Sequence, residues 1–177
     1  MIFEATDIAG AWAIRLERQI DERGGFARLF DREIFAARGL SETFVQQSLS
    51  VSHRAGTLRG MHFQRAPHEE TKFVRCVRGA IYDVIADLRR ASPSYGRWQA
   101  FTLTAEGDLS LYIPAGCAHG FQTLSDDTEV LYQMDAPYVP AAADGFHYAD
   151  PFFAIEWPRE VAAISQKDRS WPRLSER

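Results

Sequence analysis

The sequence predicts an all-β domain of the sandwich or barrel type. Turn-forming residues, among them Gly24, Gly56 and Gly79, recur about every ten residues, which is the spacing of short strands joined by tight turns. Between the turns lie short runs rich in Phe, Val, Ile, Tyr and Leu. The most regular of these runs are predicted as strands, and they span residues 74–77, 80–87, 98–103, 109–114 and 129–134.

Within 129–134, the residues Val130, Tyr132 and Met134 alternate and are expected on one face of the strand. Only residues 31–38 are predicted as a regular helix, with Asp31 as its N-cap and Gly39 at its end. Three prolines punctuate the tail of about 150–177, which is expected to wrap over the β core. Residues 1–177 are therefore predicted to form one domain.

Composition narrows the function. Of the 177 residues, 46% are hydrophobic and 25% charged, as in ordinary globular domains. The net charge of −4 argues against nucleic acid as the main partner. The N-terminus is acidic where a signal peptide is basic, and no apolar run approaches the ~20 residues of a membrane span. Cys76 and Cys117 have no paired spacing, so we expect buried thiols in a cytoplasmic protein without a membrane partner.

The segment Thr57–Gln64 carries the strongest sign of a site. It places His62 between Arg59 and an amide inside an apolar, strand-like run. Arginine suits a phosphate or carboxylate, and histidine can take a proton near neutral pH. Gly60 allows a backbone or a ligand to come close. The competing interpretation is a plain strand with one satisfied histidine and a surface arginine.

A second motif, Pro114–Phe121, has the Pro-x-Gly-x-x-His spacing of cupin barrels, in which the histidine, here His119, points inward. Metal-binding cupins also carry two histidines separated by one residue, and here the second imidazole is replaced by Gln64. The polar residues 68–70 fit a solvated turn. We therefore expect no metal and no cofactor, while a metal-dependent oxygenase or isomerase that uses His62, His119 and a carboxylate stays open.

Without a metal, the remaining chemistry is acid and base catalysis. His62 is the candidate base, and Asp168 on the tail is a candidate to fix its tautomer. Tyr132 is a candidate acid, and Lys72 could stabilise an oxyanion. Each has a plainer interpretation, since tail carboxylates are usually solvated, strand tyrosines usually belong to the core and single lysines usually lie on the surface.

These motifs, in this order, closely resemble dTDP-4-dehydrorhamnose 3,5-epimerases over nearly the whole chain. The segments that carry the resemblance are 58–64, 72–76, 80–89, 92–96, 112–121 and 155–168. The resemblance implies a metal-free, cupin-type jelly-roll barrel with short flanking helices. It also implies a homodimer and a nucleotide-diphosphate 4-keto-6-deoxy sugar as substrate.

The resemblance also implies roles. His62, supported by Asp168, removes protons from the carbons beside the C4 ketone; Tyr132 returns a proton from the opposite face, and Lys72 steadies the enolate oxygen. Substrate-binding roles fall on seven further residues: Arg23 and Arg59 for the diphosphate, His119 for the sugar, Tyr138 for stacking on the base, and Gln47, Ser48 and Arg28 near the nucleotide.

Three positions depart from the family pattern, and all three concern the nucleotide. Arg28 and Ala143 each stand where the family usually has a glutamate, and Ser48 replaces an asparagine. Thymine N3 donates a hydrogen bond, whereas cytosine N3 accepts one, which suits an arginine. The same chemistry on a CDP- or GDP-linked sugar therefore stays open, and inversion at one carbon only is a separate alternative. A non-catalytic sugar-nucleotide binding module is a third.

Overall fold

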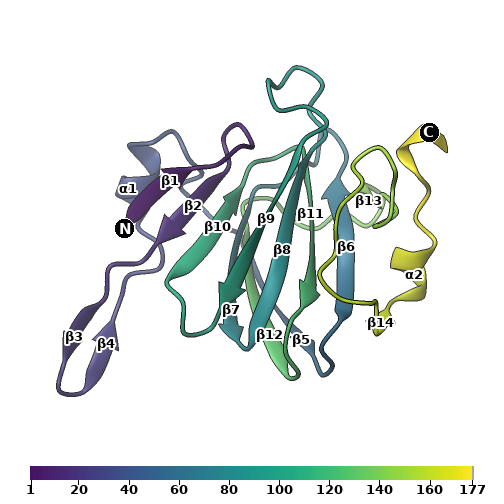
Figure 1. Ribbon diagram of the computed structural model, residues 1–177. Helices are drawn as coiled ribbons and strands as arrows, with labels where there is room; N and C mark the ends of the chain where they lie inside the picture. Colours follow the sequence, from purple (N-terminus) through teal and green to yellow (C-terminus); the bar gives the residue numbers. More distant parts are fainter. Residues whose placement is uncertain (177) are drawn as a thin grey trace.

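Two antiparallel sheets face each other in the computed structural model, which describes residues 1–176 (Figure 1). The first runs in the order β1 (Ile2–Ala5), β2 (Trp12–Arg15), β10 (Leu109–Ile113), β7 (Lys72–Arg78), β12 (Thr128–Met134) and β5 (Gln46–Ser52). The second runs in the order β13 (Ala143–Gly145), β6 (Thr57–Gln64), β11 (Cys117–Thr123), β8 (Ala80–Asp87) and β9 (Trp98–Thr104), with β14 (Ala163–Ile164) added parallel to β6. The all-β prediction is confirmed.

The predicted strands are all present, and 80–87 has the predicted bounds. The predicted helix is α1 (Arg32–Ala36), which is shorter than expected. Asp31 caps it, because its side chain accepts hydrogen bonds from the amides of Glu33 and Ile34. Gly39 follows the helix with φ +67°, a backbone conformation that glycine tolerates best.

The tail contains helical turns that the sequence prediction omitted, α2 (Gln166–Arg169) and the 3₁₀ turn η1 (Leu174–Glu176). Ser165 caps α2, because its hydroxyl accepts a hydrogen bond from the Asp168 amide. A serine followed three residues later by an acidic residue is a helix-start signal, so the sequence did contain the information. Pro172 limits the helix to little more than one turn.

The main core lies between the two sheets and follows strand alternation. Its buried members come from β7, β8, β10, β11 and β12: Val74, Cys76, Ile81, Ile85, Leu111, Ile113, Cys117, Phe121 and Val130. Tyr132 packs against this core two residues after Val130, as the alternation predicted. Positions that continue the same inward faces are polar, and these positions make the site described below.

Two glycines allow β6 and β11 to approach each other closely. A Cβ on Gly60 would lie 2.7 Å from the Cα of Gly120, and a Cβ on Gly120 would lie 2.9 Å from the carbonyl oxygen of Arg59. Any side chain at either position would push the strands apart. The close approach sets the register in which His119 and His62 are paired across the two strands.

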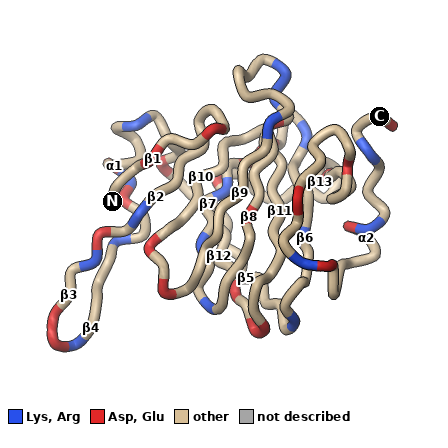
Figure 2. The backbone as a smooth tube through the Cα atoms, in the orientation of Figure 1, with Lys and Arg blue, Asp and Glu red and all other residues tan. Residues whose placement is uncertain are grey.

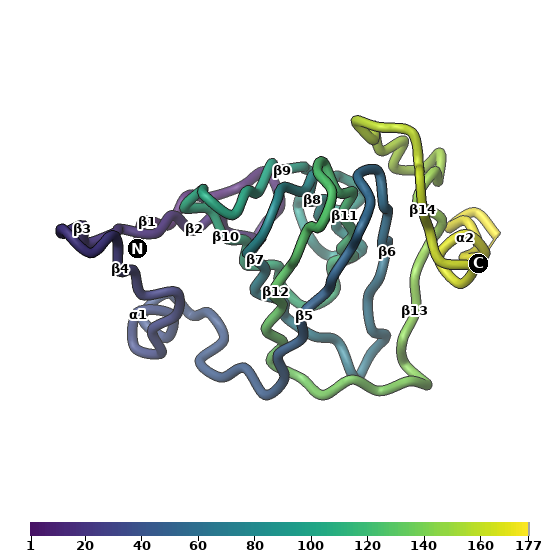
Figure 3. The backbone as a smooth tube through the Cα atoms, turned by 90° about the horizontal axis from the view of Figure 1, so that it is seen from below, coloured from purple at the N-terminus to yellow at the C-terminus, as the bar shows by residue number. Residues whose placement is uncertain are grey.

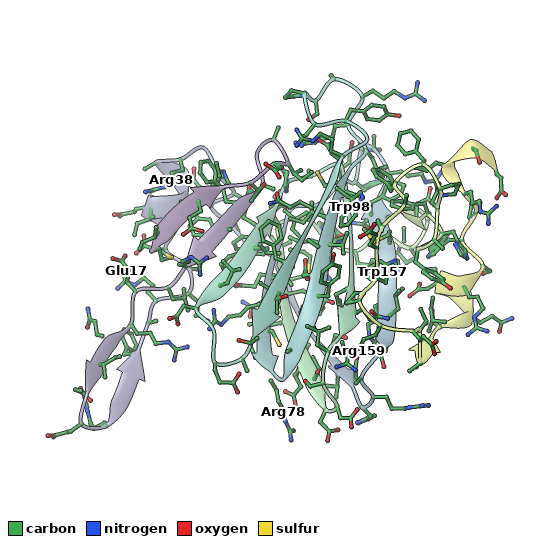
Figure 4. All side chains as sticks on the ribbon, viewed as in Figure 1. Glu17, Arg38, Arg78, Trp98, Trp157 and Arg159 are labelled. Carbon is green, nitrogen blue, oxygen red and sulfur yellow. The ribbon has the colours of Figure 1, made fainter. Side chains whose placement is uncertain are left out.

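Further apolar layers cover the outer faces of the sheets. Phe35 of α1 packs edge-on against Phe73 and Phe3 over the first sheet. Over the second sheet, Trp157 of the tail contacts Tyr82 edge-on, and Trp98 belongs to the same cluster (Figure 4). This apolar packing holds the tail against the barrel, so that α2 lies beside β6.

The hairpin of β3 (Gln19–Asp21) and β4 (Gly24–Phe26) projects from the barrel as an arm, on the side opposite the tail (Figure 3). Its apolar side chains Ile20 and Phe26 are exposed.

Basic and acidic residues are interspersed over the chain (Figure 2). Within residues 1–176, no helix is long and apolar enough to cross a membrane.

Candidate active site

A cavity of about 860 Å³ opens between the sheets and is closed on one side by the tail. β5, β6, β7, β11 and β12 line it, together with α2 and the loop after β12. Eight of the residues singled out from the sequence lie on its wall: Ser48, Arg59, His62, Lys72, His119, Tyr132, Tyr138 and Asp168. Residues more than 100 positions apart in the chain are thereby brought to one place.

His62 and Asp168 form a hydrogen-bonded pair. The His62 Nε2 atom lies 2.6 Å from Asp168 Oδ1, and the other carboxylate oxygen accepts a hydrogen bond from the Gly60 amide. The His62 side chain is 41% exposed to the cavity, while that of Asp168 is 7% exposed. A buried carboxylate behind a partly exposed imidazole fixes the ring and leaves its other nitrogen free to meet a ligand.

The environment keeps Asp168 ionised. Burial by itself raises the pKa of this carboxyl, but hydrogen bonds from His62 and Gly60 outweigh it and leave the pKa below its ordinary value. The carboxylate therefore stays negative near neutral pH, where it stabilises an imidazolium if His62 accepts a proton.

On the neighbouring strand, His119 forms a second pair, with Asp83 of β8. His119 Nε2 lies 2.8 Å from Asp83 Oδ2, and both side chains are almost completely buried. The other oxygen of Asp83 has no hydrogen-bond partner among residues 1–176. Sequence reasoning assigned Asp83 no role. The sequence could have revealed Asp83, because it is an acid at an inward position of an apolar strand. Burial of a carboxylate there is unfavourable unless the carboxylate is paired.

Tyr132 lies edge-on to His119, with ring centroids 5.8 Å apart. Burial, together with the nearby charge of Asp83, raises the pKa of the Tyr132 phenol. The phenol is therefore protonated at neutral pH and available as a proton donor. Tyr132 belongs to the first sheet and His62 to the second, so a base and an acid stand on facing walls of the cavity.

Lys72 begins β7 and lies on the cavity wall, where its ammonium group donates to the carbonyl oxygen of His62 at 3.3 Å. Burial lowers the pKa of Lys72, and the nearby carboxylate of Glu70 opposes that effect. The interpretation of residues 68–70 as a solvated turn is wrong for Glu70, which lines the cavity. It is right for His68 and Glu69, which are exposed.

The expected binding role of Gln47 does not fit the structure. Strand alternation turns Gln46, Ser48 and Ser50 of β5 toward the cavity, so Gln47 points to the opposite face. Gln46, which sequence reasoning passed over, accepts a hydrogen bond from the Tyr138 amide and thereby positions that ring at the cavity mouth. An offset of one residue explains the error, because neighbours in a strand face opposite sides.

Arg23 and Arg28 lie outside the cavity of their own chain. If they bind the nucleotide diphosphate, they do not bind it in that cavity. Arg23 is on the arm, 84% exposed and paired with Asp21. Arg28 follows the arm, is 64% exposed and pairs with Asp31. By contrast, Arg59 does line the cavity, held by a bond to the carbonyl oxygen of Val51 at 2.9 Å.

Trp171 is a further wall residue that the sequence did not suggest. Its ring lies edge-on to His62, with centroids 6.5 Å apart. Within residues 1–176, no group of three or more His, Cys, Asp or Glu side chains is arranged to hold a metal ion. The ionisable groups of the cavity are instead arranged as pairs.

Comparisons with known proteins match one family. Its family model, described as dTDP-4-dehydrorhamnose 3,5-epimerase, covers residues 5–176. A curated dTDP-4-dehydrorhamnose 3,5-epimerase from Sinorhizobium fredii is 40% identical, over 99% of this chain and 91% of its own. A dTDP-4-dehydrorhamnose 3-epimerase from Streptomyces niveus is 39% identical, over 96% and 82%. The crystal structure of the 3,5-epimerase from Elizabethkingia anophelis superposes with a TM-score of 0.95 at 32% identity, covering 100% and 98%.

The Asp168 pair predicts an acid-dependent stability. Because the folded-state pKa of Asp168 is depressed, its contribution is present above the unfolded value of 3.8 and is lost as pH falls through the folded value. We expect Asp168→Asn to lower the free energy of unfolding by about 1–3 kcal/mol at pH 6. The difference from wild type should shrink at pH 3. Urea unfolding at both pH values measures it, and a difference independent of pH would contradict the assignment.

Proposed function

The chain belongs to the dTDP-4-dehydrorhamnose 3,5-epimerase family, and we propose that it inverts C3 and C5 of dTDP-4-dehydro-6-deoxy-D-glucose to form dTDP-4-dehydro-L-rhamnose. It is an isomerase of deoxysugar biosynthesis. The observation that carries the proposed mechanism is the placement of His62, backed by Asp168, and Tyr132 on facing walls of one cavity. Inversion at carbon needs a base on one face and an acid on the other.

The residues account for each step. A ketone at C4 makes the hydrogens at C3 and C5 acidic, because the carbanion delocalises onto the carbonyl oxygen. His62 removes the hydrogen, and the Asp168 carboxylate stabilises the imidazolium that forms. The Lys72 ammonium stabilises the enolate oxygen, and Tyr132 delivers a proton to the opposite face of the carbon. His119, held by Asp83, contacts the sugar.

One set of groups serves both carbons if the ring shifts between two positions. The relative from Streptomyces niveus is named a 3-epimerase, so inversion at a single carbon is the closest alternative. We assign inversion at both carbons to this chain because its Sinorhizobium fredii relative is named a 3,5-epimerase.

We also propose that the active unit is a homodimer. Arg59 is on the wall of its own cavity, but Arg23 and Arg28 are on or beside an exposed arm that projects away from the barrel (Figure 1). If they bind the nucleotide diphosphate, as the resemblance implies, they bind it in the cavity of a second copy. The exposed Ile20 and Phe26 of the same arm would then be covered.

We propose that residues 1–177 act as one domain, supported by a cavity whose wall includes both barrel strands and the tail; residue 177 lies outside the described residues. The buried, unpaired thiols of Cys76 and Cys117 support the proposed cytoplasmic location.

Proton exchange tests the reaction directly. We expect wild-type protein, incubated with dTDP-4-dehydro-6-deoxyglucose in heavy water, to exchange the hydrogens at C3 and C5, as read by NMR. His62→Ala should slow exchange by about 10²–10⁴-fold, because the base is lost. Tyr132→Phe should retain part of the exchange while forming less inverted product, since the base remains. The absence of exchange with wild type would refute the proposal. Gln47→Ala, on the outward face of β5, is the control and should behave as wild type.

Mixed dimers test the arm. Arg23→Ala and His62→Ala should each be weakly active alone. In a mixed dimer, the Arg23→Ala chain keeps His62 and receives an intact arm from its partner. Random mixing by co-refolding should therefore restore about one quarter of the wild-type activity, because half the dimers are mixed and each has one complete site. If the activity of the mixture is only the average of the activities of the two variants, Arg23 binds the substrate in the cavity of its own chain.

A second candidate keeps the reaction and changes the nucleotide. Ala143 and Ser48 line the cavity where the family has larger polar side chains, and Arg28 reverses the charge of the glutamate that meets thymine. Arginine donors suit the unprotonated N3 of cytosine. These three departures are the observations that support a CDP- or GDP-linked 4-keto sugar as the second candidate.

Calorimetric titration with dTDP, CDP and GDP separates the two candidates. The second candidate predicts that CDP or GDP binds at least about tenfold more tightly than dTDP, which is 1.4 kcal/mol. A clear preference for dTDP contradicts it and leaves the first candidate. Arg28→Glu should shift the preference toward dTDP if the arginine meets the base.

A further inference from the structure

Glu70 is an acid in the cavity wall that the mechanism above does not use. It is the third residue of the run His68, Glu69 and Glu70 in the β6–β7 connection, and only this third side chain turns inward. The side chains of Glu70 and Lys72 are each only 10% exposed. A carboxylate so far from water is stable only with close partners.

Both oxygens of Glu70 have a partner. Oε1 lies 3.3 Å from the Lys72 ammonium, and Oε2 accepts a hydrogen bond of 2.9 Å from the Gln64 amide nitrogen. Gln64 is itself fixed, since its Nε2 also donates to the carbonyl oxygen of His68 and its Oε1 accepts from the Val139 amide. The carboxylate is therefore anchored to the end of β6.

The Lys72 ammonium makes two polar contacts within residues 1–176. It donates to the His62 carbonyl oxygen at 3.3 Å and pairs with Glu70. Glu70 and the His62 carbonyl oxygen thus hold the ammonium against β6, the strand that carries the candidate base. Lys72 itself belongs to β7 of the opposite sheet. An ammonium group has three hydrogens, so one remains for a ligand in the cavity.

We propose that Glu70 is a positioning residue, whose carboxylate holds the Lys72 ammonium at the cavity wall for its contact with the C4 oxygen of the substrate. The inference rests on the proposed function for the last part only. Glu70 does not touch the reacting atoms and acts through Lys72. Its negative charge also stabilises the charged form of a lysine that would otherwise be buried without a counter-ion.

The charge of Lys72 depends on a small set of neighbours. Burial lowers the pKa of Lys72, and Glu70 is the strongest group that raises it. Asp83 of β8 and Cys117 of β11 act in the same direction more weakly. The other titratable groups that line the same cavity come from the surrounding strands, the loop after β12 and the tail: Arg59, His62, His119, Tyr132, Tyr138, Asp144, Lys167 and Asp168. Removal of the Glu70 charge should therefore release the ammonium proton at lower pH.

The sequence offers a direct measurement, because the chain has two lysines only, Lys72 and Lys167. Protein labelled with ¹³C and ¹⁵N in lysine gives one side-chain Cε–Nζ signal for each, and Lys167→Arg assigns them. The exposed Lys167 is then an internal reference. Titration from pH 6 to 11 is run on wild type, Glu70→Gln and Glu69→Gln. The last variant removes the same charge one residue away, on an exposed side chain.

We expect the Lys72 midpoint in wild type to lie below the ordinary value for a lysine. In Glu70→Gln it should fall further by about one unit or more, a tenfold change in proton affinity, while Lys167 does not move. Glu69→Gln should leave both midpoints within about 0.3 units of wild type. An unchanged Lys72 midpoint in a folded Glu70→Gln protein would overturn the proposal. If that variant does not fold, Glu70→Asp, which withdraws the carboxylate by one methylene, replaces it with the same criterion.

The pH profile of proton exchange provides the second measurement. In Glu70→Gln, kcat at pH 8–9 should fall about tenfold. The alkaline limb of the profile should move toward lower pH by the same interval as the Lys72 midpoint. A limb that stays in place while the midpoint moves would overturn the link to the substrate oxygen. The titration needs no substrate, so a wild-type protein that exchanges no ring hydrogens refutes the proposed function without affecting the Glu70–Lys72 result.

Discussion

Ionisable side chains inside a β-barrel have to be paired, because an isolated charge away from water is strongly unfavourable. The cavity of this protein meets that constraint three times: Asp168 pairs with His62, Asp83 with His119 and Glu70 with Lys72. Asp168 joins α2 of the tail to β6, and Asp83 joins β8 to the adjacent β11. Glu70 instead pairs with a lysine only two residues along the chain. Two of the three pairs in the candidate site therefore also connect separate structural elements.

Strand geometry decides which groups meet. The Gly60–Gly120 contact places β6 and β11 so close that His62 and His119 face each other in register. β8, beside β11, adds Asp83, and β12 of the facing sheet adds Tyr132, both from inward faces whose other positions form the apolar core. A base on one sheet and an acid on the other then require no special loop. The separation of the two sheets supplies the distance that a sugar ring needs.

The tail adds what the barrel lacks. Its prolines prevent a long helix, and its aromatic residues pack on the outer face of the second sheet. That packing delivers a one-turn helix to β6, with Asp168 behind His62 and Trp171 beside it. Most of the barrel site is complete without the tail, but His62 has its carboxylate partner only when the tail is docked. Docking and formation of the candidate base are therefore one event.

The sequence by itself determined the all-β class, the five most regular strands, the Asp31 cap and eight residues of the cavity wall. Strand periodicity gives the inward and outward positions, and the family likeness points to the residues among them that carry a role. The sequence failed where one residue of register matters, as for Gln47 against Gln46. It also failed where a partner is distant in sequence, as His119 is for Asp83, and where a residue of a polar loop turns inward, as Glu70 does. Only the tertiary structure decided that Arg23 and Arg28 point away from their own cavity. The reason is physical: periodicity is a local property of the chain, whereas the pairing of buried charges and the direction of an arm depend on contacts between segments far apart in sequence.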